Sequence, residues 1–227
     1  MRYVVFAGGT GIDTDRINRI LTDEDHILCA DEGAFNAMKT GRIPDRLIGD
    51  MDSIDPETLD WVFKNSIPTD VFPSEKDMTD SELCLAQIPE NAIILFVLPL
   101  CGRFDYVFSN IMIAARYARE DRKIVLTDGR TRIYFVAGPD CLSLDIIEGK
   151  EWIGAEDLIL SVIPILGPAE NIRASGLYYP IDGLTLIPGV SRGVSNRPRE
   201  GERVVSLTLS SGVIMVTVNS ENYSINP

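Results

Sequence analysis

The stretch Ala92-Ile93-Ile94-Leu95-Phe96-Val97-Leu98 is apolar at every position and decides the fold class of the first half of the chain. A strand without polar alternation is typical of a parallel sheet that is covered on both faces. It is followed by Asp105–Arg119, where apolar residues recur at helical spacing, and by a second apolar run, Lys123–Thr127. This order of strand, helix and strand predicts a parallel sheet with right-handed crossovers.

The same alternation extends upstream to the first residues of the chain. Strands are predicted at Tyr3–Ala7, Ile27–Ala30, Leu47–Gly49 and Thr69–Phe72, and helices at Asp13–Leu21, Ala34–Thr40, Pro56–Lys64 and Asp77–Gln87. Asp55 is expected to cap the helix that begins at Pro56, and either Asp77 or Thr79 the helix that follows. We therefore expect a Rossmann-like α/β domain over residues 1–130.

The pattern changes after about residue 130. Short β-like runs follow one another, separated by Gly, Pro, Asn and Ser: Arg132–Ala137, Cys141–Ile147, Leu158–Ile165, Leu184–Ile187, Val204–Leu209 and Val213–Val218. Such spacing is typical of an all-β sandwich or barrel. We therefore expect a second domain over residues 131–227, a β-sandwich.

Composition and charge exclude several classes of protein. The 227 residues carry a net charge of −13, so the chain is not expected to bind nucleic acid, which needs a basic surface. The longest apolar run, Ala92–Leu100, is too short to span a bilayer, and the N-terminus does not read as a signal peptide. Four cysteines without a C-x-x-C pair, and a single histidine, make a zinc site improbable and fit a reducing cytoplasm.

Acidic residues follow several of the predicted strands or open the helices behind them. The set comprises Asp31, Asp50, Asp52, Asp77, Asp80 and Asp105. In an open α/β sheet the carboxyl ends of the strands lie at one edge, and ligands bind there. We therefore expect these carboxylates to converge.

The spacing of these carboxylates suggests a cation site. Asp50 and Asp52 lie two apart on a segment that we expect to be extended, so both side chains point the same way. Asp77 and Asp80 lie three apart on the predicted helix and share a face. Carboxylates in one cleft repel each other unless a cation lies among them, and oxygen ligands suit Mg²⁺.

Two basic residues beside the acidic clusters extend this interpretation. Lys76 and Arg103 could hold phosphate oxygens, and metal, carboxylates and cations together are the usual equipment for phosphoryl transfer. Each feature also has a simpler explanation: Asp77 as a helix cap, Asp-x-Asp as a turn, Arg103 as a surface residue. The loop Gly8-Gly9-Thr10-Gly11 follows a strand and could meet phosphate, but it lacks the third glycine of the dinucleotide fingerprint, and a tight turn between strand and helix is the favoured interpretation.

Seven motifs, in order along the chain, resemble those of the thiamine pyrophosphokinase family. They are Ala30-Asp31-Glu32-Gly33-Ala34, Pro44-Asp45 with Gly49-Asp50-Met51-Asp52-Ser53-Ile54, Glu75-Lys76-Asp77-Met78-Thr79-Asp80, Gly102-Arg103-Phe104-Asp105 with Asn110, Ser161-Val162-Ile163-Pro164, Gly176-Leu177-Tyr178-Tyr179-Pro180 and Gly193-Val194-Ser195-Asn196. Any one of them is modest, whereas seven in the right order are specific. The resemblance implies an α/β domain, a β-sandwich and a homodimer.

The resemblance also implies an activity. The family moves the diphosphate of ATP to the hydroxyl of thiamine, giving thiamine diphosphate and AMP, and needs Mg²⁺. Two alternatives remain open: a related Mg²⁺-dependent diphosphokinase acting on another alcohol, such as a hydroxymethylpterin, and a non-catalytic nucleotide or thiamine sensor.

Roles for individual residues follow from the match. As metal ligands it implies Asp50, Asp52, Asp77 and Asp80, of which Asp50, Asp52 and Asp80 are also catalytic, together with Arg103 and Asp105. As nucleotide or phosphate ligands it implies Asp31, Lys76, Arg103 and Asn110. Asp105 would orient or deprotonate the thiamine hydroxyl, either as a base or by hydrogen bonding to a ligand of the metal. Ser195 and Asn196 would bind thiamine from the β domain at the subunit interface, in the same or the other subunit.

The chain departs from the family pattern at four positions. Glu32 replaces a glycine, Cys101 stands where a glycine is common, Tyr106 where a histidine often follows the aspartate, and Arg197 where an acidic residue is frequent. None of these changes removes a proposed metal carboxylate. Glu32 and Arg197 concern the details of the nucleotide and thiamine contacts.

Overall fold

The computed structural model describes residues 1–153 and 157–220. The chain divides into two compact units. The first comprises Met1–Asn110 and Arg122–Gly129, and the second comprises Ile111–Asp121 together with the chain from Arg130 onward. In the part of the chain that is described, no helix combines the length and the apolar character needed to cross a membrane.

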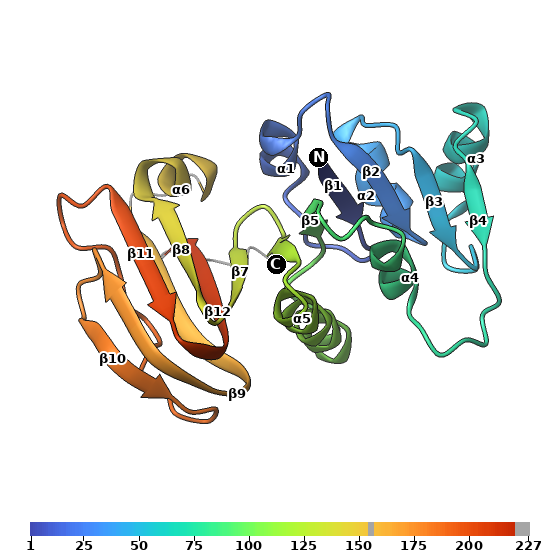
Figure 1. Cartoon of the computed structure of the whole chain (residues 1–227). Coiled ribbons are helices and arrows are strands. Elements are labelled where there is room, and N and C mark those ends of the chain that lie inside the picture. The colour runs from blue at the N-terminus through green and yellow to red at the C-terminus, as the bar shows by residue number, and fades with distance from the viewer. Residues whose placement is uncertain (154–156, 221–227) are drawn as a thin grey trace. The chain divides into compact units, whose positions relative to one another are not determined.

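The first unit is built on a parallel sheet (Figure 1). Its strands are β1 (Arg2–Phe6), β2 (His26–Ala30), β3 (Arg46–Gly49), β4 (Thr69–Val71), β5 (Ile93–Val97) and β6 (Lys123–Thr127). They lie in the order β4-β3-β2-β1-β5-β6, and each neighbouring pair is parallel. The predicted strands are therefore confirmed, with ends that shift by one residue or so.

Five helices connect these strands: α1 (Thr14–Ile20), α2 (Gly33–Thr40), α3 (Pro56–Lys64), α4 (Asp80–Ala86) and α5 (Phe104–Arg119). The chain winds outward from β1 to β4 and then returns to add β5 and β6 on the other side of β1. Because right-handed crossovers put connections on opposite faces when the winding reverses, α1 to α3 cover one face and α4 the other. A crevice is expected at the carboxyl ends of β1 and β5, where the direction changes.

Helix α2 approaches the sheet closely because it begins with a glycine. A Cβ atom on Gly33 would lie 2.0 Å from the carbonyl oxygen of Phe6, so a larger residue would force α2 away from β1. The buried core on this face includes Val4, Phe6 and Ile17 at 0% exposure. Cys29 of β2 belongs to the same core, so burial holds the ends of both β1 and β2, the strands that precede the glycine loop and Asp31.

Helix α4 begins later than the sequence suggested. The helix was expected to start at Asp77, but it starts at Asp80, and the Thr79 hydroxyl accepts the Glu82 N–H over 3.2 Å as its N-cap. Thr79 satisfies a free N–H at the first turn, so the residues before it lie outside the helix. The expectation that Asp77 and Asp80 share a helix face was therefore wrong.

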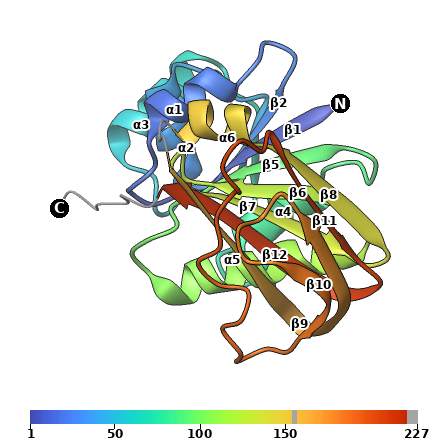
Figure 2. The same ribbon diagram turned by 90° about the vertical axis from the view of Figure 1, so that its left-hand side faces the viewer.

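The second unit is rich in antiparallel strands (Figure 2). They are β7 (Arg132–Ala137), β8 (Asp140–Asp145), β9 (Leu158–Ser175), β10 (Ile181–Leu186), β11 (Val204–Leu209) and β12 (Ser211–Ser220). The first half of β9 pairs with β12, and its second half pairs with β10 and β11. This one strand therefore belongs to two groups of strands, β7-β12-β9 and β10-β9-β11-β8.

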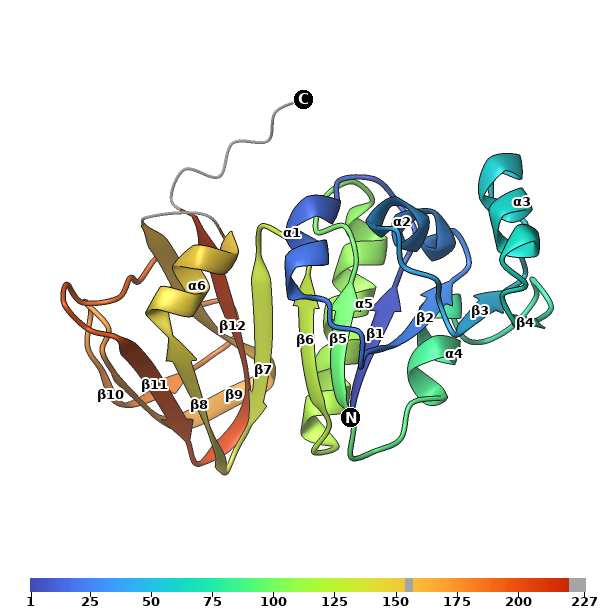
Figure 3. The same cartoon turned by 90° about the horizontal axis from the view of Figure 1, so that it is seen from above.

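Two features of this unit differ from the sequence-based expectation. The run Leu158–Ile165 is only the first half of β9, which continues through Gly167 and Pro168 to Ser175. The predicted strand Cys141–Ile147 ends at Asp145, where helix α6 (Ile146–Ile153) begins and lies against β8 and β12 (Figure 3). Asp145 starts this helix by accepting the N–H groups of Ile147 and Glu148 over 2.9 and 3.2 Å.

Candidate functional site

Three carboxylates meet at the carboxyl edge of the parallel sheet. Asp31 follows β2, and Asp50 and Asp52 follow β3. One oxygen from each of the three lies within 4.8 Å of the others. The sheet therefore brings together residues that are about 20 positions apart in the sequence.

Backbone conformation makes this meeting possible. Asp31 and Met51 have φ values of 47° and 67°, in the left-handed region. A Cβ on Gly49 would lie 2.9 Å from the Cβ of Asp31, so glycine is needed where the two strand ends pass. The expectation of an extended segment at Asp50 and Asp52 was wrong, because Met51 turns the chain.

Hydrogen bonds fix the orientation of the three carboxylates. Met51 N–H donates to Asp31 Oδ1 over 3.1 Å, and Asp52 N–H donates to Asp50 Oδ1 over 3.2 Å. The Ser53 hydroxyl donates to Asp52 Oδ1 over 2.9 Å. Each carboxylate thus keeps at least one free acceptor position, since it has about four in total.

The electrostatic environment shifts the pKa values of Asp31 and Asp50 in opposite directions. The pKa of Asp31 is raised, first by its partial burial and then by the negative charges of Asp80 and Asp50. The pKa of Asp50 is lowered by hydrogen bonds from the Asp52 backbone and the Ser74 side chain. Asp31 is therefore the carboxylate whose ionised form gains most from a nearby cation.

Lys76 lies between two of the acidic residues. Its Nζ is 3.5 Å from Asp50 Oδ2 and 3.1 Å from Asp80 Oδ1. Desolvation lowers the pKa of Lys76, but the two carboxylates outweigh this effect and raise it overall. The ammonium group is therefore held charged at this edge, where an anionic ligand would meet it.

The donor set fits a hard divalent cation. Its three members supply oxygen atoms only, and one of them, Asp31, is a carboxylate whose pKa is raised first by its partial burial and then by its acidic neighbours. Mg²⁺ prefers such ligands and usually retains several waters. Asp31, Asp50 and Asp52 would hold the ion, so Asp31 joins two of the residues that the sequence analysis assigned to metal.

The other predicted residues of this half lie in different settings. Asp80 contacts Lys76 at the start of α4, whereas Asp77 is exposed in the loop before it. Arg103 and Asp105 are exposed and form a two-point ion pair, with Nη2 to Oδ2 at 2.7 Å, which lowers the pKa of Asp105. Asp77 and Asp80, which the sequence analysis assigned to the metal, are therefore not members of the cluster formed by Asp31, Asp50 and Asp52.

A cavity of about 410 Å³ opens next to the cluster. It is lined by Gly8, Gly9, Thr10, Ala30, Asp31, Glu32, Ser53, Asp80, Pro99, Cys101, Gly102, Arg103, Tyr106 and Val107. The loops after β1 and β5 both contribute to it, so it occupies the crevice where the winding of the sheet reverses. Its size lies in the range of ligand pockets.

The sequence analysis did not predict a set of polar side chains beside the cavity, Ser81, Tyr106 and Asn110. The Tyr106 hydroxyl lies 3.0 Å from Ser81 Oγ, and Ser81 is fully buried. Asn110, one helical turn after Tyr106, is 1% exposed and does not line the cavity. Burial raises the pKa of Tyr106, with Asp80 and Asp31 adding to the effect. Helical spacing between Tyr106 and Asn110 was the only sequence signal for this group.

In the second unit, Ser195 and Asn196 line a cavity of about 820 Å³ together with Tyr178, Tyr179 and Arg197. Ser195 is exposed and has a φ of 58°, and its N–H donates to Ser161 Oγ over 3.1 Å. The guanidinium of Arg197 lies 4.3 Å from the centre of the Tyr178 ring. An aromatic and polar surface is therefore available for a flat ligand.

The Asn196 amide is used for structure. It is 3% exposed, its Oδ1 accepts the N–H groups of Tyr179 and Arg197 over 3.0 and 2.9 Å, and its Nδ2 donates to the Tyr179 carbonyl over 2.8 Å. The nearby Gly193 has no room for a side chain, because a Cβ would lie 2.0 Å from Val162 O. The motifs of the second half therefore hold one another in place.

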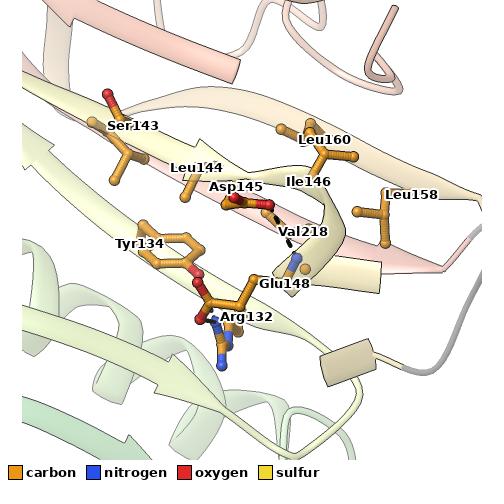
Figure 4. A pocket seen from close by; sticks show the side chains of 12 residues that line it. Arg132, Tyr134, Ser143, Leu144, Asp145, Ile146, Glu148, Leu158, Leu160 and Val218 are labelled. Carbon is orange, nitrogen blue, oxygen red and sulfur yellow. Dashed lines mark hydrogen bonds and ion pairs between the residues drawn. The ribbon is translucent and has the colours of Figure 1, made fainter. Parts of the chain in front are cut away.

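A smaller cavity of about 240 Å³ lies between β7, β8, β9, β12 and α6 (Figure 4). Arg132 in its wall lies 3.2 Å from the Tyr134 hydroxyl and 3.6 Å from Glu148, and Asp145 caps α6. None of the predicted site residues lines it. Its charged groups pair with one another or cap α6, so this cavity is a weaker candidate for the functional site.

Comparison with known proteins matches both halves of the chain to one family. Residues 17–126 match the model "Thiamin pyrophosphokinase, catalytic domain", and residues 153–214 match "Thiamin pyrophosphokinase, vitamin B1 binding domain". The chain is 27% identical over 192 residues to "Thiamine pyrophosphokinase 3" of Oryza sativa subsp. japonica, covering 80% of this chain and 68% of the relative. It is also 27% identical over 178 residues to "Thiamine pyrophosphokinase" of Bacillus subtilis (strain 168), covering 77% and 79%.

Solved structures show the same fold. The thiamine pyrophosphokinase of Bacillus subtilis superposes with a TM-score of 0.80 at 19% identity, covering 97% of this chain and 100% of that one. The enzyme of Geobacillus thermodenitrificans gives a TM-score of 0.80 at 21% identity, covering 99% and 100%. The carboxylate cluster and the adjacent cavity lie largely in the region that the catalytic-domain model matches.

Proposed function

The chain belongs to the thiamine pyrophosphokinase family, and from this premise we propose that it transfers the diphosphate group of ATP to the hydroxyl of thiamine in a Mg²⁺-dependent reaction. The products are thiamine diphosphate and AMP. The observation that carries the proposal is the meeting of Asp31, Asp50 and Asp52 at the carboxyl edge of the sheet. Such a cluster is what a magnesium-nucleotide complex requires.

We assign the two steps of recognition to the two halves of the chain. Residues 1–130 form a Rossmann-like domain that binds ATP and Mg²⁺, which the doubly wound order of the sheet supports. Residues 131–227 form a β-sandwich that binds thiamine and makes a homodimer. The two halves of β9 pair with different groups of strands, which supports the two sheets of a sandwich. Unpaired cysteines suit the cytoplasm as the place of action.

In the proposed reaction the thiamine oxygen attacks the β-phosphorus of ATP, and AMP leaves. Mg²⁺, when bound by Asp31, Asp50 and Asp52, neutralises negative charge on the diphosphate. Lys76 and Arg103 hold phosphate oxygens, for which the ammonium and the exposed guanidinium are suited.

Asp80 and Asp105 have supporting parts in this proposal. Asp80 keeps Lys76 charged and in place from the first turn of α4. Asp105 forms its ion pair with Arg103 and would exchange that partner for the thiamine hydroxyl or its proton. Because its pKa is lowered, Asp105 is ionised at neutral pH and can accept a hydrogen bond.

The thiamine contacts come from the second unit. Ser195 faces the large cavity beside the Tyr178 ring, and Asn196 positions the backbone of Tyr179 at its rim. Thiamine is cationic, so aromatic faces and an acidic protein suit it. We place this site at the homodimer interface.

A single incubation tests the proposal. Purified protein is mixed with Mg-ATP and thiamine, and the products are weighed by mass spectrometry. Thiamine diphosphate with equimolar AMP is the expected result. ADP with thiamine monophosphate would contradict diphosphate transfer, and the absence of any thiamine product would direct the search to other alcohols, beginning with pterins.

A further inference from the structure

Glu32 places a negative charge at the glycine-rich end of the cavity beside the acidic cluster. It follows Asp31 at the end of β2 and precedes the first residue of α2. Its Oε2 accepts the backbone N–H of Gly9 over 3.0 Å, which ties the end of β2 to the loop after β1. Both Glu32 and Gly9 line the cavity.

This contact changes what the glycine loop can bind. A loop of this kind commonly offers its N–H groups to phosphate, but here the Gly9 N–H already has a carboxylate partner. A phosphate placed beside Glu32 would meet a like charge. This end of the cavity therefore suits a neutral group that donates a hydrogen bond.

The carboxylate has acceptor capacity for such a group. A carboxylate offers about four acceptor positions. Within residues 1–153 and 157–220 the Gly9 N–H is the one hydrogen-bond donor found for the Glu32 side chain. Glu32 can therefore keep Gly9 and accept a ligand hydroxyl at the same time.

We propose that Glu32 reads the sugar of the nucleotide by accepting a hydrogen bond from a ribose hydroxyl, and so makes the enzyme selective for ribonucleotides. The proposal rests on the proposed function, because it takes ATP as the diphosphate donor. In doubly wound sheets, an acidic residue at the end of the second strand commonly meets the ribose of a nucleotide bound over the first glycine loop. Gly9 lies in the loop after β1, and Glu32, two residues after the end of β2, reaches that loop with its side chain.

The position of the metal cluster favours the ribose over the base amine as the partner. Asp31, the neighbour of Glu32, belongs to the cluster with Asp50 and Asp52, which would gather the phosphates. The sugar is attached directly to the phosphate chain, whereas the adenine amine lies at the far end of the molecule. Glu32 is therefore within reach of the ribose when the phosphates lie at the cluster.

The test compares ATP, 2′-deoxyATP, 3′-deoxyATP and ITP as substrates and as ligands. Steady-state kcat/KM and calorimetric binding are measured for the wild-type enzyme, Glu32→Ala and Glu32→Gln. Glu57→Gln is the matched control, because Glu57 is an exposed glutamate on α3 that does not line the cavity. Circular dichroism and thermal melting establish that each variant folds.

The wild-type enzyme is expected to prefer ATP to one of the deoxy analogues by about tenfold or more, since a site built around a hydroxyl rejects a ligand that lacks it. Glu32→Ala should lose that preference because its kcat/KM for ATP falls, whereas Glu57→Gln should retain it. Glu32→Gln, which keeps an acceptor oxygen, should lie between.

Several results would overturn the inference. One is that the wild-type enzyme shows equal kcat/KM for ATP and both deoxy analogues, and another is that Glu32→Ala keeps the wild-type preference. A third is that Glu32→Ala has a higher kcat/KM for every nucleotide, which would mean that Glu32 obstructs binding. Loss of discrimination against ITP alone would assign Glu32 to the base. If ATP and thiamine give no thiamine diphosphate, the proposed function fails, and the binding comparison still decides whether Glu32 reads the sugar.

Discussion

The backbone N–H of Met51 donates a hydrogen bond to Asp31 Oδ1 over 3.1 Å, across 20 residues of sequence. This bond joins the end of β3 to the end of β2 and aims the Asp31 carboxylate at Asp50 and Asp52. Both Met51 and Asp31 lie in the left-handed backbone region to make it. The fold thus holds one carboxylate close to others, and this arrangement has measurable consequences.

Asp31→Asn should stabilise the metal-free protein while weakening its binding of metal. Asparagine keeps an acceptor for Met51 and tolerates the left-handed backbone, and it removes the repulsion from Asp80 and Asp50. We expect a gain of a few tenths to about 1 kcal/mol at neutral pH, because solvent screens a half-exposed group. Urea unfolding in EDTA measures the gain, and calorimetric titration with Mg²⁺ measures the affinity.

The same substitution has a pH dependence with a definite sign. The pKa of Asp31 is raised in the folded state, so the wild-type protein loses stability as pH rises through that folded pKa. Below the unfolded pKa the carboxyl is protonated in both states and costs nothing. The stability difference between the variant and the wild-type protein should therefore shrink on acidification. A difference that grows as pH falls would contradict the raised pKa.

Asp52→Asn should abolish turnover with the fold intact. Asp52 is exposed and supplies one of the three clustered oxygens, so its charge matters to the cation and hardly to the core. We expect kcat to fall by about 100-fold or more, the scale seen when a group that stabilises charge in the transition state is removed. Asp60→Asn on α3 is the control, with a stability change within about 0.5 kcal/mol. Near-normal turnover in Asp52→Asn would remove Asp52 from the metal site.

Lys76→Met should make the protein depend on added magnesium for its stability. The substitution leaves Asp50 and Asp80 without the cation that now lies 3.5 and 3.1 Å from them. We expect a loss of about 1 kcal/mol in EDTA, and a larger rise of Tm on addition of MgCl₂ than in the wild-type protein. The KM for ATP should also rise. Equal shifts of Tm in both proteins would show that Lys76 and the metal do not share these carboxylates.

Asn196→Ala and Ser195→Ala should separate structure from recognition in the second unit. Loss of the buried Asn196 amide leaves the Tyr179 N–H and carbonyl without their partner, for an expected cost of about 2 to 3 kcal/mol in unfolding free energy. Ser195 is exposed at the cavity, so its change should leave Tm nearly unaltered and raise the KM for thiamine. Thermal melting and thiamine saturation curves measure the two effects.

Local signals explain why most of the first unit could be predicted. Asp55 accepts the N–H groups of Glu57 and Thr58 over 3.0 Å each, as its place before Pro56 suggests, and α3 has the predicted bounds. The run around Phe96 forms a strand that is buried on both faces. Capping and burial depend on a few neighbouring residues, so they are visible in the sequence.

The errors concern residues whose conformation depends on distant partners. Met51 turns into the left-handed region at a strand end beside Asp31, which no local pattern indicates. Helix α4 begins at Asp80, and Asp77 stays in the loop before it. In the second unit β9 extends past Gly167, because β10 and β11 pair with its second half.

The sequence by itself determined the order of strands and helices in the first unit, the family and the set of acidic residues at the strand ends, because periodicity, caps and motifs are properties of short segments. Only the tertiary structure decided which of these residues meet. Asp31 lies close to Asp50 and Asp52, and Lys76 forms ion pairs with Asp50 and Asp80. Glu32 accepts a hydrogen bond from the Gly9 N–H. These contacts link residues about 20 or more positions apart, or depend on a turn between near neighbours, so they exist only once the sheet has assembled.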